Sequence, residues 1–317
     1  MTVFANDDGS KRMASSQPSI FNAWYRAARP RTLTATYVPL GAAAALAIQN
    51  RVFNVPLFVL SLIAALLLQI AANLINEYFD FRRGAEDLKQ AGQGMILKQG
   101  LLTPRQVLIG AVVTLVAGSL IGLFLLTQSG PLLLWIGLGG VLVVIAYTAG
   151  PFPLAYNGLG EVAVFIFMGP LMVLGAYYVM AGAFDPQPLI VGVPIGFMVA
   201  AILHANNVRD IDADRAVNKR TLAVLLGLRA ARIEYQLLVG GAYVMVALLI
   251  LGGVMPITTL VVLLTVPEAL KLVAIINTSR DQQLLHQAQG RTAKLHGEFG
   301  FWLVIGWAAW LALDLFI

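Results

Sequence analysis

Two stretches of the sequence gather carboxylates and amides at the end of a long apolar run. They hold Asn73, Asn76, Glu77 and Asp80 in the first stretch and Asn206, Asn207, Asp210, Asp212 and Asp214 in the second. A shift of 130 positions places Asn76 on Asn206 and Asp80 on Asp210. Clusters of oxygen ligands select a hard cation, and Mg²⁺ is typically held by a few carboxylates together with substrate phosphates. The two stretches therefore predict a pair of Mg²⁺ sites that clamp a diphosphate and help it leave.

The spacing within the first stretch places its side chains on one face of a helix. Successive residues of a helix are rotated by about 100° around its axis. On this geometry Asn73, Asn76, Glu77 and Asp80 all fall on one face about 100° wide, with Asn76 and Glu77 at its two edges. Asp87 joins this face if the helix continues that far. The first stretch is therefore expected to present its ligands to one site.

The second stretch has the same property. Asn206, Asp210 and Asp214 follow one another at intervals of four residues and share a helix face, whereas Asp212 points away. Single carboxylates at helix ends are often merely solvated, and this is the alternative. Here, however, asparagine, which does not favour helices, recurs at matched positions in apolar surroundings. Ionisable groups near membrane depth are also costly and usually functional, so we interpret both stretches as functional.

The elements that must position these residues are helices that cross a membrane. Of the 317 residues, 59% are hydrophobic and 12% are charged, against about 25% charged in a typical soluble domain. The absence of cysteine excludes disulfides and thiolate metal sites. Apolar runs of about 20 residues, each long enough to span a bilayer, recur along the chain. The sequence predicts an all-α polytopic membrane protein with nine spans, at about residues 33–49, 55–79, 104–127, 131–149, 160–182, 187–208, 234–251, 256–277 and 299–317.

The distribution of basic residues predicts the orientation of these spans. If the N-terminus is cytoplasmic, the inside segments hold 19 of the 21 Lys and Arg, and this bias places the C-terminus outside. Both acidic stretches then reach the cytoplasmic face, where we expect a central cavity to open. We expect a disordered cytoplasmic tail at residues 1–19 and one intramembrane domain at 20–317, in the plasma (inner) membrane. The net charge of +5 needs no nucleic-acid partner, and no obligatory protein partner is evident.

Two long inside loops, at residues 80–103 and 209–233, each follow an acidic stretch. Long polar loops beside a site often act as lids. The two loops also end alike, because Gly100 and Leu101 correspond to Gly227 and Leu228 at an offset of 127 positions. Together with the offset of the acidic stretches, this match predicts two parallel halves of four spans each, followed by a ninth helix.

Basic and aromatic side chains near the two stretches complete the expected chemistry. Arg29 and Arg31 precede the first span and Lys98 and Lys219 lie in the two loops, where they would hold the outer diphosphate oxygens. Positive-inside anchoring is the alternative for any single one of them. Loss of diphosphate from an allylic donor leaves a carbocation, which an aromatic ring stabilises. Tyr147, near the inner end of the fourth span, is the candidate for this role, with an interfacial anchor as its alternative.

These motifs resemble the UbiA superfamily of intramembrane prenyltransferases, from about residue 20 to 317. The family pattern on the second helix is Asn-xxx-Asp-xxx-Asp, which Asn76 and Asp80 match, and that on the sixth is Asp-xxx-Asp, which Asp210 and Asp214 match. The resemblance implies nine helices in parallel halves, Mg²⁺ as the cofactor and a polyprenyl diphosphate as the donor.

The sequence departs from the family pattern at two positions. Gly84 stands where the family has its third acid, and the resemblance moves that metal-binding role to Asp87. Glu77 replaces the usual Asp after Asn76. This replacement keeps the charge but adds a methylene group, so the distance at which Glu77 would coordinate a metal stays open.

Several short motifs resemble the family branch that acts on 1,4-dihydroxy-2-naphthoate in menaquinone or phylloquinone synthesis. They begin at Arg29, Asn73, Tyr147, Pro151, Gly158, Asn206, Lys219 and Thr292. The resemblance implies an electrophilic aromatic substitution in which the naphthoate ring attacks an allylic cation, CO₂ is lost and a demethylquinol forms. It also implies that Glu161 deprotonates or orients the aromatic acceptor. A carboxylate placed favourably on a helix dipole is the alternative for Glu161.

The predicted site residues fall into three groups by role. The candidate catalytic residues are Asp80, Asp210, Asp214, Tyr147 and Glu161. The candidate Mg²⁺ ligands are Asn76, Asp80, Asp87, Asp210 and Asp214. The candidate substrate-binding residues are Asn73, Asn76, Arg29, Lys98, Asn206, Asn207 and Lys219.

The sequence also allows other functions, and other polar residues have structural roles. Prenyl transfer to 4-hydroxybenzoate or chlorophyllide is an alternative within the family, whereas the motifs of the haem branch are missing. A cation-coupled transporter is the alternative from another class, although such sites usually lie at the bilayer midplane. We favour an interhelical hydrogen bond over a metal role for His204. We expect Glu268 and Lys271 to form a structural pair or a partly hydrated face, and His286 and His296 to lie at the surface.

Overall fold

The computed structural model describes residues 19–85 and 95–314, and this part of the chain is helical almost throughout. Within it, the one contact of strand type is an isolated bridge between Asn157 and Arg220. The elements are α1 Ile20–Ala28, η1 Pro30–Thr32, α2 Thr34–Gln49, α3 Val55–Arg82, α4 Pro104–Ser129, α5 Leu132–Ala146, η2 Leu154–Tyr156, α6 Gly160–Met168, α7 Pro170–Ala181, α8 Gln187–Arg209, α9 Ile211–Ala216, α10 Leu222–Leu251, η3 Ile257–Thr265, α11 Val266–Thr278 and α12 Gln282–Asp314.

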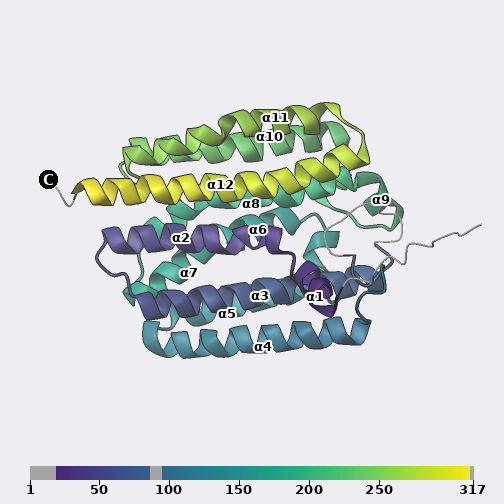
Figure 1. Cartoon of the computed structure of the whole chain (residues 1–317), viewed down its shortest axis with the longest axis horizontal. Helices are drawn as coiled ribbons and strands as arrows, with labels where there is room; N and C mark the ends of the chain where they lie inside the picture. The colour runs from purple at the N-terminus through teal and green to yellow at the C-terminus, as the bar shows by residue number, and fades with distance from the viewer. Residues whose placement is uncertain (1–18, 86–94, 315–317) are drawn as a thin grey trace, which may run out of the picture.

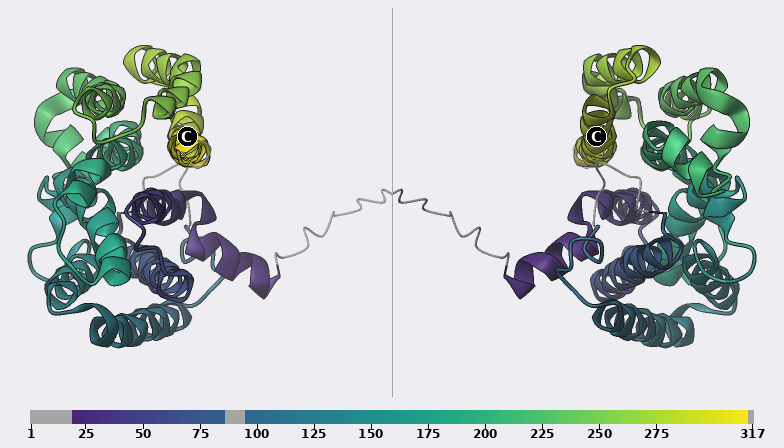
Figure 2. Two further views of the ribbon diagram at one scale, coloured as in Figure 1. Left: turned by 90° about the vertical axis from the view of Figure 1, so that its left-hand side faces the viewer. Right: turned by 90° about the vertical axis from the view of Figure 1, so that its right-hand side faces the viewer.

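The long helices run along a common direction and form one bundle (Figure 1). The short helices α1 and α9 lie at one end of this bundle, and the C-terminus of α12 lies at the opposite end. Figure 2 shows the same helices from their ends. The two acidic stretches, at the end of α3 and at the junction of α8 with α9, therefore meet at the same end of the bundle.

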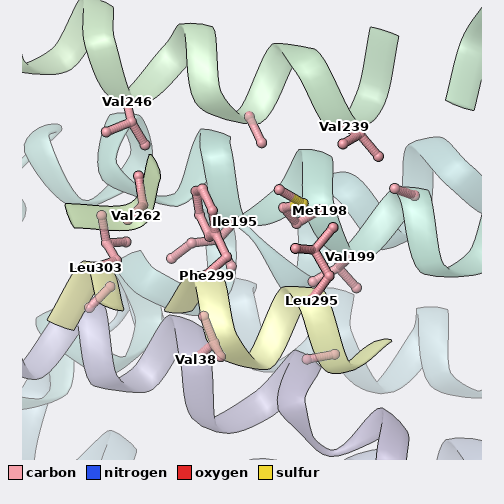
Figure 3. Packing of buried hydrophobic residues seen from close by; sticks show 14 of the residues in the cluster. Val38, Ile195, Met198, Val199, Val239, Val246, Val262, Leu295, Phe299 and Leu303 are labelled. Atoms are coloured by element: carbon pink, nitrogen blue, oxygen red, sulfur yellow. The ribbon is translucent and has the colours of Figure 1, made fainter. Parts of the chain in front are cut away.

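The main core of the bundle forms around α8, which packs against α2, α6, α7, α10 and α12. Figure 3 shows the apolar side chains that fill the space between α2, α8, α10, η3 and α12. They include Val38, Ile195, Met198, Val199, Val239, Val246, Val262, Leu295, Phe299 and Leu303. This packing fixes α8, and with it the second acidic stretch, against the rest of the chain.

A glycine contact brings α6 and α8 unusually close together. Gly169 breaks the helix between α6 and α7, because Pro170 follows it and cannot donate a backbone hydrogen bond. A Cβ atom at Gly169 would lie 2.5 Å from the Cα of Gly196, and one at Gly196 would lie 2.7 Å from the carbonyl oxygen of Phe165. Any side chain at these positions would separate the two helices. The close approach places Glu161, at the start of α6, beside the C-terminal end of α8.

Six helices of the described chain are long and apolar enough to cross a membrane: Val55–Arg82, Pro104–Ser129, Gly160–Ala181, Gln187–Arg209, Leu222–Leu251 and Ile257–Thr278. The bent pair Ile20–Thr32 and Thr34–Gln49 would make a seventh, and Leu132–Ala146 is apolar but shorter. Each of the nine expected spans falls on a helical segment where it is described. The chain is thus a multi-pass helical membrane protein.

One of the two expected long loops differs from its prediction. The expected loop at 209–233 is mostly helix, because α9 fills its first part and α10 already begins at Leu222, capped by the side chain of Thr221. Gly227 kinks α10 with φ 77°, and its counterpart Gly100 has φ 67°. α12 begins at Gln282, well before the expected ninth span. Hydropathy cannot distinguish a loop from a polar helix end that projects beyond the apolar run. The starts of α10 and α12 were therefore predicted wrongly.

The first acidic stretch ends where its helix ends. α3 stops at Arg82, and Gly84 adopts φ 68°, a left-handed conformation that glycine tolerates better than other residues. α3 therefore ends before Asp87, and the condition for Asp87 to share the helix face of the first stretch is not met. Asp87 itself lies outside the described residues, so its predicted role as a metal ligand stays a prediction.

Three predictions about isolated polar residues also need correction. Glu268 pairs with Arg291, at 2.8 and 2.9 Å, and not with Lys271, which is exposed. His296 is fully buried, and His286 is partly buried and contacts Arg209. These contacts join α11, α12 and α8 across long sequence distances, which local sequence spacing does not reveal.

Candidate active site

A cavity of about 210 Å³ lies at the end of the bundle where the acidic stretches meet. Charged and amide side chains line part of it and apolar side chains line the rest, and we call it the polar cavity because it holds these charged groups. Eight of the predicted site residues line it: Arg29, Asn73, Asn76, Asp80, Tyr147, Asn206, Asn207 and Lys219. Further lining comes from Thr32, Gln69, Met95, Thr148, Arg209 and Gln289. Asp210, Asp214 and Glu161 do not line the cavity but contact residues that do. Lys98 is exposed and is not among the lining residues.

One lysine joins the two acidic stretches. Lys219 Nζ lies 3.9 Å from Asp80 Oδ2 and 3.9 Å from Asp214 Oδ1. Asp214 and Lys219 are buried, so these charges interact in a medium of low dielectric constant. The arrangement collects two carboxylates from distant parts of the chain around one position that favours a cation.

Backbone contacts hold Lys219 in this position. The Lys219 N–H donates to the carbonyl oxygen of Asp214 at 2.8 Å, which closes the turn after α9. The Arg220 N–H donates to the carbonyl oxygen of Tyr156 at 3.2 Å, and the isolated bridge between Asn157 and Arg220 forms here. The segment around η2 thus fixes the loop that carries the lysine.

Tyr156 is a site residue that the sequence reasoning missed. Its hydroxyl donates to Asp80 Oδ1 at 2.8 Å. The Arg83 guanidinium lies 4.7 Å from the centre of its ring and Lys219 Nζ lies 5.1 Å from it, both within cation–π range. Burial and the nearby Asp80 carboxylate raise the pKa of the Tyr156 phenol. The phenol therefore stays protonated and donates to Asp80.

Arg209 neutralises Asp210, a second buried aspartate of the second stretch. Its guanidinium donates to both carboxylate oxygens of Asp210 at 2.6 Å and to Asn206 Oδ1 at 2.8 Å. Arg209 Nη1 also lies 2.9 Å from His286 Nδ1. Burial and the neighbouring Arg209 charge lower the pKa of His286, so its neutral ring accepts this hydrogen bond. Arg209 and Asp210 are both buried, which makes this pair a second point where cation and carboxylate meet.

Glu77 does not join the other carboxylates. Its fully buried side chain accepts hydrogen bonds from the backbone N–H groups of Met95, Ile96 and Leu97 and a 2.8 Å ion pair from Arg29. These contacts occupy both of its oxygens. The extra methylene group lets Glu77 reach residues 95–97 within the first loop, so its role here is to anchor that part of the loop and Arg29.

The asparagines of the first stretch make local contacts beside the cavity. Asn73 Nδ2 donates to the carbonyl oxygen of Ala28 at 2.9 Å and to Thr32 Oγ1 at 3.2 Å, so it holds the link between α1 and α2. Asn76 Oδ1 accepts from Thr148 Oγ1 at 2.8 Å. Both side chains line the cavity while they fix neighbouring elements against α3.

The side chain of Glu161 is buried between α6 and α8. Asn207 Nδ2 donates to Glu161 Oε1 at 2.8 Å, and His204 Nδ1 lies 3.0 Å from the same oxygen. His204 Nε2 lies 2.7 Å from the carbonyl oxygen of Ala231, which confirms the predicted interhelical hydrogen bond. The Tyr147 hydroxyl is buried and has no hydrogen bond within the described structure. Tyr147 and Asn207 line the cavity, so Glu161 lies just behind its wall.

An apolar cavity of about 370 Å³ continues from the polar one. The two cavities share four lining residues: Gln69, Val143, Phe167 and Met168. Apart from Ser61, Gln69 and Ser119, the lining of the second cavity is apolar, and it comes from α2, α3, α4, α5, α6 and α7. A ligand with a charged head group and a hydrocarbon tail fits these two adjoining cavities.

The chemistry of the residues at the polar end suits a hard divalent cation. Asn76, Asp80, Asp210 and Asp214 offer amide and carboxylate oxygens, which Mg²⁺ prefers. In the described structure, Lys219 and Arg209 place positive groups against the three carboxylates and compensate their charge. The oxygen donor set fits Mg²⁺.

This fold and site define a multi-pass helical membrane protein that pairs buried carboxylates with an adjoining apolar cavity. The chain belongs to the UbiA prenyltransferase family, whose model matches residues 37–297, and it is a prenyltransferase.

Two curated relatives from bacteria cover most of the chain. The protein from Bacillus subtilis is 32% identical over 94% of this chain and 96% of its own length. The protein from Mycobacterium tuberculosis is 38% identical over 73% of this chain and 79% of its own length. Both are named 1,4-dihydroxy-2-naphthoate octaprenyltransferase.

Solved structures share the fold. A UbiA homolog from Aeropyrum pernix has a TM-score of 0.66 at 17% identity and covers 86% of this chain and 97% of its own. A UbiA homolog from Archaeoglobus fulgidus, bound to GPP and Mg²⁺, has a TM-score of 0.60 at 17% identity and covers 89% of this chain and 99% of its own.

Proposed function

We propose that this enzyme transfers a polyprenyl group from an allylic diphosphate to 1,4-dihydroxy-2-naphthoate, with loss of diphosphate and CO₂, to give demethylmenaquinol. The proposal rests on one arrangement: Lys219 contacts Asp80 and Asp214 beside the polar cavity, and the polar cavity adjoins the apolar one. The names of the bacterial relatives support the naphthoate acceptor.

Mg²⁺ is the proposed cofactor. Asn76, Asp80, Asp210 and Asp214 would hold it, with Asp87 as a further ligand. When bound, the ion neutralises the diphosphate and helps it leave. The Mg²⁺ in the Archaeoglobus fulgidus structure supports this assignment.

The residues of the chain bind and orient the two substrates. Lys219 and Arg29 line the polar cavity and would bind the outer oxygens of the diphosphate. The isoprenoid tail would lie in the apolar cavity, which excludes water from the reacting carbon. Tyr147 presents an aromatic ring to the developing allylic cation, and Glu161 with Asn207 orients the aromatic acceptor. Lys98, Asn73, Asn76 and Asn206 are proposed to support substrate binding.

The proposal includes a membrane topology. Nine spans, formed by α2, α3, α4, α5, α6 with α7, α8, α10, η3 with α11, and α12, would make two parallel halves of four spans and a ninth helix. The bias of Lys and Arg supports a cytoplasmic N-terminus, an outside C-terminus and a site that faces the cytoplasm. Residues 20–317 would form one domain in the plasma (inner) membrane.

Purified enzyme in lipid nanodiscs tests the proposal directly. It is incubated with Mg²⁺, a polyprenyl diphosphate and one acceptor at a time, and the product mass is measured. We expect a prenylated naphthoquinol whose mass lacks the carboxyl group, and no product after chelation of divalent ions. Prenylation of 4-hydroxybenzoate alone would overturn the choice of acceptor. A product that keeps the carboxyl group would overturn the loss of CO₂.

A further inference from the structure

Three ionisable side chains from different helices meet behind the wall of the polar cavity. Glu161 comes from α6, His204 from α8 and Glu234 from α10. Glu161 and His204 are buried, and the side chain of Glu234 is 19% exposed. Burial of two carboxylates and an imidazole is costly unless their charges and protons compensate one another. Of the three, the reaction described above uses only Glu161.

The hydrogen bonds of His204 determine where its protons lie. Nε2 is 2.7 Å from the carbonyl oxygen of Ala231, which can only accept, so Nε2 carries a proton. Nδ1 is 3.0 Å from Glu161 Oε1, and a hydrogen bond at this distance requires one more proton between the two atoms. Asn207 also donates to Glu161 Oε1. This oxygen therefore suits a carboxylate that accepts from two donors, beside an imidazolium.

The outer oxygens of this group are poised to exchange protons. Glu161 Oε2 and Glu234 Oε2 are both buried and have no hydrogen bond within the described structure. Glu161 lies next to the cavity, because Asn207, to which it is bonded, lines that cavity. Glu234 Oε2 is 3.6 Å from His204 Nε2, just beyond hydrogen-bond distance. A path with one gap, between Nε2 and Glu234 Oε2, thus leads from the cavity wall through the imidazole to a partly exposed carboxylate.

We propose that Glu161, His204 and Glu234 form a proton relay for the aromatic acceptor, an inference that rests on the proposed function. As the ring carbon bonds to the allylic carbon, the O–H bond of a ring hydroxyl breaks and its electron pair forms a C=O group. The proton goes to Glu161 Oε2, and the Nε2 proton of His204 passes to Glu234. When CO₂ leaves, its bonding electrons restore the aromatic ring, and the oxygen takes its proton back as the relay runs in reverse.

Proximity alone would also allow these three side chains to hold a metal ion, since their ligand atoms lie within 4.8 Å of one another. The bond to Ala231 commits Nε2, the ring nitrogen near Glu234, and leaves only Nδ1 for a metal. The geometry therefore favours hydrogen bonding, and His204 and Glu234 act as positioning residues through Glu161.

The test compares Glu234→Gln with wild type in the nanodisc assay, using whichever acceptor the wild type prenylates. Glu268→Gln is the matched control, because Glu268 is a partly exposed glutamate outside the relay that pairs with Arg291. We expect Glu234→Gln to lower kcat by about 10- to 100-fold, within the range for general acid–base catalysis. KM and the acceptor-independent hydrolysis of the donor should stay unchanged. An acceptor with a more acidic, fluorine-substituted ring should restore much of the lost rate.

His204→Gln, checked for folding by thermal unfolding, should show the same loss of kcat and the same rescue. Wild-type kcat in Glu234→Gln, or a loss that the acidic acceptor does not rescue, would overturn the relay. A transition metal bound stoichiometrically by wild type and lost in His204→Gln would overturn it in favour of a metal site. Failure of the wild type to prenylate naphthoate would contradict the proposed function and not the relay. The two proposals can therefore be tested separately.

Discussion

Asp80 and Asp214 lie 134 positions apart and face the same ammonium group, because Lys219 Nζ is 3.9 Å from a carboxylate oxygen of each. Without that charge, the two carboxylates would repel each other at the head of the cavity. On the proposed function, Mg²⁺ and diphosphate bind beside this lysine. The contact therefore links the stability of the free enzyme to its affinity for metal.

The first prediction concerns Lys219→Met. Loss of the ammonium group removes a compensating charge from Asp80 and Asp214, so the variant should unfold at a lower temperature than wild type when divalent ions are absent. Added Mg²⁺ should stabilise the variant more than it stabilises wild type, while the KM for the donor rises because diphosphate loses a cation. Thermal unfolding in detergent, with and without Mg²⁺, measures the first effect. An equal Mg²⁺ effect in both proteins would contradict the prediction.

The second prediction separates the aspartates of the second stretch. Asp214→Asn should lower turnover by at least about 100-fold, as expected for loss of a group that stabilises transition-state charge. Asp212→Asn, on the same short helix, should keep normal turnover, because the Asp212 side chain is 84% exposed and, among the described residues, pairs with Arg215 alone. Steady-state rates with saturating Mg²⁺ provide the measurement. Similar losses in both variants would show that α9 acts through its fold and not through one carboxylate.

The third prediction concerns the anchor formed by Glu77. Glu77→Gln removes the charge that faces Arg29 and weakens the bonds to the backbone of residues 95–97, so it should destabilise the enzyme by about 3 kcal/mol. Adding Arg29→Gln should cost less than the sum of the two single changes, because one charge no longer lies buried without the other. Urea unfolding in mixed micelles measures the free energy of unfolding of each protein in this double-mutant cycle. Strict additivity would mean that the pair is not coupled.

The fourth prediction tests the apolar cavity. Gly140 lines it, and a Cβ atom there would meet nothing within 4 Å, so Gly140→Leu should fill the cavity near the site without a backbone clash. The variant should prefer donors with shorter tails, whereas wild type accepts longer ones. Gly240→Leu is the control, because Gly240 also has open space around it but lies outside both cavities. Competition between donors of different length, read by product mass, decides the outcome.

The fifth prediction concerns Tyr156→Phe. The hydroxyl donates to Asp80, so its loss should raise the Mg²⁺ concentration needed for half-maximal rate several-fold. Because burial and Asp80 raise the pKa of this phenol above its usual value of about 10, the hydrogen bond persists throughout the neutral and alkaline assay range. Wild type and variant should then show rate profiles of the same shape below pH 10. A wild-type alkaline limb that disappears in the variant would show that the phenol titrates there.

Much of the site could be predicted because its residues contrast with their surroundings. Asp80, Asp210 and Asp214 stand at the ends of apolar helices, where carboxylates are costly and therefore conspicuous. The match of the two stretches after a shift of 130 positions strengthened this signal. The structure places Asp80 at the cavity and Asp214 beside it, joined through Lys219.

Other parts of the site depend on contacts that sequence spacing does not encode. Glu77 bonds to backbone atoms 18 to 20 positions further along the chain, so nothing in its own stretch distinguishes an anchor from a ligand. Tyr156 and Arg83 lie in polar connections where aromatic and basic residues are common at membrane interfaces. The sequence around Tyr156, close to a proline-rich segment, is the one signal that could have drawn attention to it.

The apolar cavity has exposed walls, because Leu123, Leu134 and Leu138 line it and are also about half exposed on the outer surface of α4 and α5. On the proposed function, an isoprenoid tail held there touches the bilayer before the new bond forms. The product can then diffuse sideways into the membrane without ever being solvated by water. Its release depends on the lipid around α4 and α5, so bilayer thickness and fluidity become determinants of turnover.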